Sequence, residues 1–343
     1  MGRITETMNL FITLDYELFL GTSTGTVENC LIKSMDAMCE VAEKYGFKYI
    51  IFVDAAYLLR LRQLKDSSES ILKQYELVVH HIQDLAKRGH DIQLHFHPQW
   101  LYSEWDDMKE VWKMDKDHYK LSDMPLEDAR CRLKEAKELL EQIVRKKIIA
   151  FRAGGFCHES FSELKDVFYR MGVIVDSSVL RNKCFISSVH SYDYRVIPQQ
   201  QIYCFENSIK EVSPKGSFVE LSISSFYWSP IRYFSCIRPI RIRFSPRINY
   251  GDGSRVSDGK RSPISSIRDV LSRRYYHASI DGEWSNLLDV YYNDAKNNNW
   301  KELILIGHPK NASDLSVKNL DKFFSSHPQV RVLTTYDIIN KVL

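Results

Sequence analysis

Two histidines share one face of a short predicted strand in the stretch GHDIQLHFHPQW, residues 89–100. Side chains alternate between the two faces of an extended chain, so His95 and His97 lie together, opposite the apolar residues of the run. Pro98 cannot donate a strand hydrogen bond and marks the end of the strand. Two imidazoles at a strand tip indicate either a metal site or a hydrogen-bonded pair in the core, and this stretch alone leaves both interpretations open.

Two carboxylates leave a second predicted strand in the same way, in the stretch TLDYE. The alternation places Asp15 and Glu17 on one face at the strand tip. Carboxylates are rarely buried unless they are paired or bind a metal, so this position indicates chemistry. The alternative interpretation is that Asp15 only caps the following turn.

Two further strand ends carry residues that fit the same chemistry. FRAGG ends one strand with Arg152, and its glycines, Gly154 among them, let a backbone or a ligand come close. LILIGHP ends another strand with His308. Together the four ends supply a carboxylate-and-imidazole metal site, a base, an acid, and a cation that holds the base in place.

Strand-like and helix-like patterns alternate along the whole chain. Predicted strands cover 9–15, 49–54, 91–97, 148–155, 173–178, 218–223, 302–308 and 330–335, and predicted helices cover 28–45, 69–88 and 126–145. This alternation predicts an α/β fold in which helices flank a parallel sheet. The sheet is either a closed barrel or doubly wound, and in both cases the chemistry lies at the carboxyl ends of the strands.

Two segments depart from this alternation. Residues 100–120 are rich in Trp and Tyr and directly follow the histidine strand, which indicates a substrate-binding loop or, alternatively, a structural excursion. Residues 232–274 contain eleven Lys or Arg and three Asp or Glu. Such a basic insertion is typical of a solvated face, and the alternative is contact with an anionic glycan or a membrane surface.

The bulk composition is that of a soluble globular protein, with 44% hydrophobic and 27% charged residues in 343. The net charge of +3 does not indicate a nucleic-acid partner. We expect the protein in the cytoplasm, because the sequence shows no secretory signal and no apolar run long enough to span a membrane. Its seven scattered cysteines, without a CxxC pair, indicate free thiols in a reducing compartment.

The ordered motifs TLDYE, GHDIQLHFHP, FRAGG, DSS and LILIGHP resemble those of the NodB-type polysaccharide deacetylases, carbohydrate esterase family 4. They resemble more closely the offshoot of that family found in lipopolysaccharide and surface-polysaccharide synthesis. The resemblance implies a single domain over 1–343, a distorted (β/α)7-type barrel that carries 232–274 as an insertion. It also implies a divalent metal, usually Zn2+, and hydrolysis of an N-acetyl or O-acetyl group on a sugar.

The resemblance assigns roles to four residues outside the metal ligands. Asp15 matches the general base, and Arg152 matches the arginine that orients this base. His308 matches the catalytic acid, and Asp176 falls where the family has an aspartate near the acid. Each assignment is an expectation that rests on the matching motif in this sequence.

The metal ligands depart from the family pattern. The family has two adjacent aspartates and two histidines four residues apart, whereas Tyr16 and Gln99 stand at the second positions here. The expected ligands therefore become Glu17, His95 and His97. Each substitute lies two residues along the chain from its partner, on the same strand face.

The predicted function is that of a metal-dependent hydrolase that removes an acyl group from a sugar or glycan intermediate of surface polysaccharide biosynthesis. Trp100 and Trp105 would stack on a sugar ring, and Gly154 would leave room for the substrate. There are two alternatives. The same barrel hydrolyses another C–N bond, in a formamide or a cyclic amide, or the protein is a catalytically silent glycan-binding protein.

Overall fold

The computed structural model describes residues 8–158, 161–187, 189–236, 248–255 and 271–342. The predicted basic segment 232–274 is covered only in part, because 237–247 and 256–270 lie outside the described residues. None of the helices in the described part of the chain is both long enough and apolar enough to cross a membrane.

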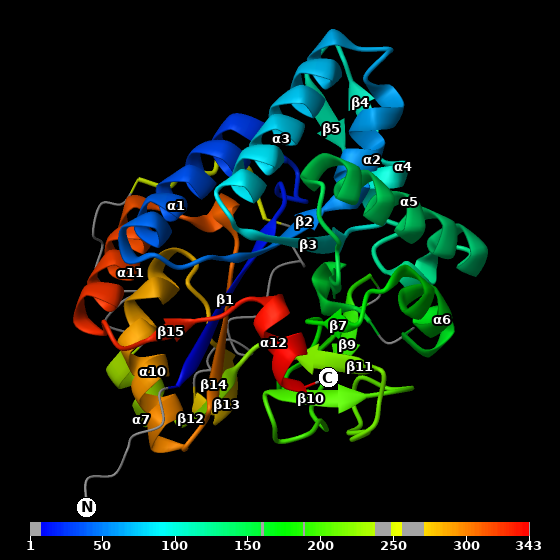
Figure 1. The fold of residues 1–343 in the computed structure, drawn as a ribbon. Coiled ribbons are helices and arrows are strands. Elements are labelled where there is room, and N and C mark those ends of the chain that lie inside the picture. The colour runs from blue at the N-terminus through cyan, green and yellow to red at the C-terminus, as the bar shows by residue number, and fades with distance from the viewer. Residues whose placement is uncertain (1–7, 159–160, 188, 237–247, 256–270, 343) are drawn as a thin grey trace, which may run out of the picture.

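A nearly closed parallel barrel forms the centre of the molecule (Figure 1). Within the described residues its path holds seven parallel strands, in the order β11 (Phe218–Leu221), β7 (Val175–Asp176), β6 (Ala150–Ala153), β3 (Asp91–Phe96), β2 (Ile50–Asp54), β1 (Asn9–Tyr16) and β14 (Glu302–Gly307). The two ends of the path approach each other, since the Ser224 amide donates to the Ile304 carbonyl at 3.1 Å. The predicted distorted (β/α)7-type barrel is therefore confirmed.

Two shorter strands extend this sheet. β10 (Ile202–Phe205) pairs antiparallel with β11, and β15 (Arg331–Val332) pairs with the start of β1. The predicted strand at 330–335 is thus present but short. A further contact helps to close the barrel, because Ser279 bridges to Ile306 on β14.

The inside of the barrel changes from apolar to polar along the strands. On β1 the inward face runs Phe11, Thr13, Asp15, and on β6 it runs Ala150, Arg152. Phe11 and Ala150 belong to an apolar cluster that also contains β2, β7 and β11 residues. The outward faces of the strands pack on the helices in a separate, larger core. The polar groups therefore gather at the carboxyl end of the barrel, as in other parallel α/β barrels.

The three predicted helices are present with small changes at their ends. The first is a π-helical turn, η1 (Glu28–Lys33), continued by α1 (Ser34–Tyr45), which ends at Gly46 with φ 72°. The second, α3 (Glu69–Lys87), begins where Ser68 Oγ accepts the Ile71 amide hydrogen. The third is α5 (Leu126–Val144). The helix α2 (Ala55–Leu64), which starts directly after β2, was not predicted.

The remaining elements surround this frame. The helices are α4 (Gln99–Tyr102), η2 (Leu121–Asp123), η3 (Gly154–Phe156), α6 (Phe161–Met171), α7 (Pro230–Cys236), η4 (Gly282–Leu287), α10 (Leu288–Asn297), η5 (Pro309–Asn311), α11 (Asp314–Ser326) and α12 (Thr335–Val342). Three two-stranded antiparallel pairs lie outside the barrel: β4 (Glu104–Asp106) with β5 (Val111–Lys113), β8 (Cys184–Ile186) with β9 (Ser191–Asp193), and β12 (Ser225–Trp228) with β13 (Arg274–His277).

Candidate metal centre

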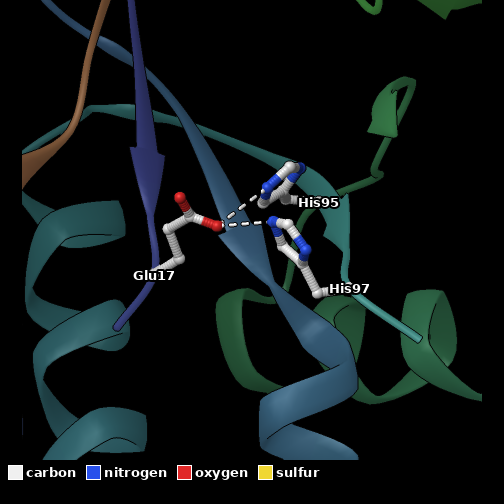
Figure 2. A group of neighbouring side chains, drawn as sticks. All are labelled: Glu17, His95 and His97. Carbon is white, nitrogen blue, oxygen red and sulfur yellow. Dashed lines mark hydrogen bonds and ion pairs between the residues drawn. The ribbon is translucent and has the colours of Figure 1, made fainter. Parts of the chain in front are cut away.

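The carboxyl ends of neighbouring barrel strands bring the expected ligands together. Glu17 directly follows β1, His95 lies near the end of β3, and His97 directly follows β3. β2 runs between these strands, and its last residue, Asp54, pairs with His95 in the sheet. Figure 2 shows the Glu17 side chain reaching toward both imidazoles.

The three side chains converge on one point. Glu17 Oε2 lies 3.2 Å from His95 Nε2 and 2.7 Å from His97 Nε2. One ligand atom from each residue lies within 4.8 Å of the other two, and all three residues are buried. One carboxylate oxygen with two imidazole nitrogens is a donor set that catalytic zinc sites use.

Backbone groups fix both imidazoles. His95 Nδ1 lies 2.8 Å from the Arg152 carbonyl and donates its proton there, so Nε2 faces Glu17 and is the nitrogen that a metal would use. The His97 amide donates to Asp54 Oδ1 at 3.2 Å. Gly154 packs on the His97 ring, since a Cβ at this glycine would lie 2.7 Å from His97 Nδ1. Gly154 thus makes room for an imidazole, which corrects its expected contact with substrate.

The charges of the cluster suit a bound cation. Burial raises the pKa of Glu17, but the charges of Lys310 and His97 outweigh this effect and bring the pKa well below its usual range. Burial lowers the pKa of His95, yet the carboxylates of Asp15 and Glu17 raise it to about 9. The carboxylates therefore favour a positive charge at His95, as a proton or as a bound cation. Together with the donor set of one carboxylate and two imidazoles, this preference means that the residues present fit a divalent metal, whose binding would release the His95 Nε2 proton.

The expected base and its arginine form a buried ion pair. Arg152 Nη1 donates to Asp15 Oδ1, and Arg152 Nη2 donates to Thr13 Oγ1 at 2.9 Å and to Ser177 Oγ at 2.8 Å. The guanidinium also lies 4.2 Å from the centre of the Phe52 ring. These contacts hold the arginine in one position, so Asp15 is fixed in direction beside the expected metal ligands.

His308 lies next to this pair and has a partner that the sequence did not predict. Its Nε2 lies 3.6 Å from Asp15 Oδ2 and 3.7 Å from Glu17 Oε1. Asp281 accepts the His308 amide hydrogen at 2.7 Å and contacts Nδ1 at 2.8 Å. Burial lowers the pKa of His308, but the Asp281 carboxylate, with Asp15 and Glu17, raises it above the ordinary value. A protonated His308 is the state that a general acid requires.

Asp176 does not approach His308, which corrects its expected position near the acid. It lies in a separate buried cluster, where its Oδ2 is 2.8 Å from His158 Nδ1 and its Oδ1 accepts the Ser178 amide hydrogen at 2.9 Å. Burial and the neighbouring Asp176 raise the pKa of Glu220 well above its usual range. Because Asp176 lies on β7 and Glu220 lies on β11, this buried cluster joins the two neighbouring strands.

Trp100 is fully buried, so the prediction that it stacks on a sugar is wrong. Its ring packs 4.6 Å from Tyr57 and 5.3 Å from Trp112, measured between centroids. Much of the aromatic surface of the Trp- and Tyr-rich segment is therefore buried in the core. Trp105 is half-buried and lines a cavity of about 230 Å³ between the loop after β1 and α3. None of the metal-cluster residues lines that cavity.

A second cavity, of about 310 Å³, adjoins the metal cluster. Two of its lining residues also contact this cluster: Lys310 binds Glu17, and Asp281 binds His308. Phe19 and Trp284 also line it, together with polar groups from 249–255. Aromatic faces mixed with polar side chains are the usual lining of a sugar site.

Neither a family model nor a curated protein matches the chain. Solved structures do match. A protein described as a polysaccharide deacetylase from Mycobacterium smegmatis is 13% identical with a TM-score of 0.54, over 100% of this chain and 92% of that chain. A GH57 branching enzyme from Thermococcus kodakaraensis is 9% identical with a TM-score of 0.50, over 98% of this chain and 71% of that chain.

A second polysaccharide deacetylase structure, from Pseudomonas aeruginosa PAO1, is 10% identical with a TM-score of 0.49, over 97% of this chain and 89% of that chain. At these identities a likeness concerns the fold. The alignments with the Mycobacterium smegmatis protein and the branching enzyme cover nearly all of this chain. The protein therefore has the fold of a polysaccharide deacetylase, a distorted (β/α)7-type barrel.

Proposed function

We propose that the protein is a metal-dependent hydrolase that removes an acyl group, such as acetyl, from a sugar. The observation that carries this proposal is the joint position of three kinds of group at one barrel end. The ligand set of Glu17, His95 and His97 lies beside the carboxylate of Asp15 on one side and the imidazole of His308 on the other. Acyl transfer to water needs such a combination.

A divalent metal, for which we propose Zn2+, would be held by the three ligands and would supply Lewis acidity to a water and to the acyl oxygen. Asp15 accepts the proton of the attacking water. Arg152 keeps Asp15 ionised and aimed at that water through their buried ion pair. His308 donates its Nε2 proton to the leaving amine or alkoxide, and Asp281 stabilises the charged imidazole from Nδ1.

The cavity beside Lys310 and Asp281 is the proposed place of the sugar. Its volume of about 310 Å³ is at the small end of ligand sites, which suits one or two sugar rings. Trp284, rather than Trp100, would offer the aromatic face on which a ring stacks. We propose an intermediate of surface polysaccharide synthesis as the substrate, and the cytoplasm as its location, which the seven unpaired cysteines support.

The test combines metal analysis with product detection. Purified protein should contain about one divalent metal per chain, and His95→Ala or His97→Ala should remove it. Acetate release is then measured on N-acetylated and O-acetylated sugars, before and after treatment with a chelator. Release from formamides or cyclic amides instead would assign another C–N bond. Protein that folds without metal and releases nothing would be a silent glycan binder, contrary to the proposal.

A further inference from the structure

Lys310 is a buried lysine beside an expected metal ligand. It lies two residues after His308, and its side chain is 9% exposed. Its Nζ donates to Glu17 Oε1 and to the Leu18 carbonyl, each at 2.8 Å. The centre of the Phe19 ring lies 5.3 Å from the same nitrogen.

The surroundings of Lys310 keep its ammonium in one place. The Leu18 carbonyl belongs to the backbone that leaves β1, so the acceptor cannot move with a side chain. Lys310 itself lies in the short turn η5, after Pro309. Gly251 packs against this turn so closely that a Cβ there would lie 2.1 Å from the Lys310 carbonyl oxygen. The ammonium therefore keeps a backbone acceptor that does not move if the Glu17 carboxylate turns.

The two oxygens of Glu17 therefore face different partners. Oε2 faces the two imidazoles, and Oε1 faces Lys310. A glutamate has one more torsion than an aspartate, and its last torsion is broad, so the side chain alone does not keep either oxygen away from an ion. A carboxylate that binds zinc through both oxygens fills a position that catalytic sites keep open for water.

We propose that Lys310 is a positioning residue that holds Oε1 of Glu17 away from the metal, so that Oε2 alone binds it. The inference rests on the proposed function, because it requires a metal at Glu17, His95 and His97. It also gives a physical reason why Glu17 can act as a ligand, although the resembling family has an aspartate one position earlier, where this chain has Tyr16. The lysine restrains the extra torsion and so preserves the open coordination position.

The test uses Co2+ as the probe metal and the visible absorption of the loaded protein as the readout. Four-coordinate cobalt absorbs visible light much more strongly than cobalt with more ligands. Lys310→Met frees Oε1 to bind, so we expect the band intensity to fall by about half or more. Lys310→Arg keeps a cationic donor and should restore the intensity. Lys44→Met, which removes a lysine paired with Asp321 on the outside of α1, is the matched control and should leave the spectrum unchanged.

The outcomes separate this inference from the proposed function. Wild-type protein that binds Co2+ and shows the same spectrum as Lys310→Met overturns the role of Lys310 and leaves the metal site intact. Wild-type protein that binds no Co2+ overturns the proposed function, and the inference falls with it. If Lys310→Met does not fold, a crystal structure of wild-type protein with Zn2+ decides: one Glu17 oxygen on the ion supports the inference, and two oxygens on the ion overturn it.

Discussion

The two carboxylates of TLDYE differ in what surrounds them. Asp15 belongs to β1 and is held from inside the barrel by Arg152. Glu17 lies beyond the strand end, and its partners are His95, His97 and Lys310. A base needs a fixed direction and an accessible lone pair, whereas a ligand needs other donors around the same point. The surroundings therefore favour Asp15 as base and Glu17 as ligand.

Replacing these two carboxylates one at a time tests the roles of base and ligand. Asp15→Asn keeps the shape but removes the basicity, so the protein should keep its metal and lose activity by roughly 10²-fold or more. Glu17→Ala removes a ligand, so metal and activity should be lost together. The measurement is metal titration beside acetate release. Should Asp15→Asn empty the site while Glu17→Ala leaves it filled, the two roles must be exchanged.

His308 should act on the reaction without holding the metal. Its Nε2 lies 3.7 Å from the nearer Glu17 oxygen, and its Nδ1 is occupied by Asp281. We expect His308→Ala to lower turnover by roughly 10²-fold or more, with metal content and melting temperature nearly unchanged. A variant that loses its metal would make His308 a ligand instead. Asp281→Asn should lower turnover to a smaller extent, because it weakens support for the charged ring.

The sequence predicted the site residues that follow strong strand patterns, and it missed those that do not. Asp15, His95 and Arg152 each end a recognisable apolar run. Asp281 follows the short stretch HASI, which joins β14 through one bridge at Ser279 and has no strand pattern of its own. The available signal for Asp281 was a run of an apolar residue, an aspartate and a glycine. Lys310 gave none, because its contact with Glu17 depends on the pairing of β14 with β1.

At the scale of elements, α12 covers the amino end of the barrel through a buried carboxylate. Asp91, the first residue of β3, accepts hydrogen bonds from the Thr335 amide at 2.8 Å and from Thr335 Oγ1 at 2.7 Å. Gln93 Nε2 donates to the same carboxylate at 2.6 Å. The helix thus begins on a charged acceptor that belongs to the central sheet.

Removing this acceptor should destabilise the fold without touching the chemistry. Asp91→Ala leaves the Thr335 amide and hydroxyl without their charged partner, so we expect a loss of about 2–4 kcal/mol in the free energy of unfolding. Asp117→Ala, at an exposed position, is the control and should change little. Urea denaturation measures both. Equal midpoints for the two variants would contradict the anchoring of α12 by Asp91.

A buried histidine couples α1 to the sheet and should make stability depend on pH. His90 Nδ1 accepts the Tyr49 amide hydrogen at 3.2 Å, so the neutral ring carries its proton on Nε2, 3.2 Å from Cys39 Sγ. Burial, with the charges of Lys48 and Arg88, lowers the pKa of His90 to about 3. Protonation would break the bond to Tyr49.

The sign of the effect follows from this lowered pKa. Between the ordinary value of 6.5 and about 3, the unfolded chain binds a proton at His90 that the folded chain does not. Stability should therefore be complete above pH 6.5 and fall as the pH drops through this window, by up to about 1.4 kcal/mol per pH unit. His90→Asn keeps the acceptor and removes the titration, so its acid slope should be shallower than that of His118→Asn. Equal acid slopes for the two variants would contradict the role of His90 in the pH dependence of stability.

Elements with a continuous apolar pattern were predictable, and elements buried by other loops were not. The strands at 49–54 and 91–97 stood out because they are apolar and end in turn residues. The segment 100–120 looked like a surface loop with free aromatic rings. Trp100 and Trp112 instead pack on Tyr57 of α2, a helix that the sequence did not predict. Without that helix, nothing in the pattern could indicate a covering partner.

At the scale of the whole molecule, stability and chemistry occupy opposite ends of one barrel. The amino end is apolar inside and covered by α12, whereas the carboxyl end gathers Asp15, Glu17, His95, Arg152 and His308. The buried charges at the carboxyl end need fixed partners to remain ionised. The apolar layer beneath them supports the strands that carry these partners. The segment 248–255 crosses toward this end, where Asp252 accepts from Thr26 of the loop after β1 and from Asn29 of η1.

We predict that the basic segment 232–274 binds an anionic glycan or membrane surface. Its excess of positive charge is eight in the sequence, and one of its described cations, Arg232, pairs with Asp294 at 2.8 Å. Cationic side chains near an anionic surface contribute roughly 1 kcal/mol each. Changing Arg238, Arg241 and Arg243 together to Ser should therefore weaken binding to phosphatidylserine vesicles by roughly 100-fold.

Salt separates this electrostatic binding from other contacts. Vesicle sedimentation should show binding at low ionic strength that weakens as salt rises past about 0.15 M, where charges are screened beyond about 8 Å. A protein with Lys73, Lys116 and Lys134 changed to Ser loses the same number of charges from other parts of the surface and should bind almost as the wild type does. If wild-type protein fails to bind anionic vesicles or a phosphorylated glycan even at low salt, the segment is an ordinary solvated face. The excess charge would then serve solubility, and the substrate would reach the barrel without help from 232–274.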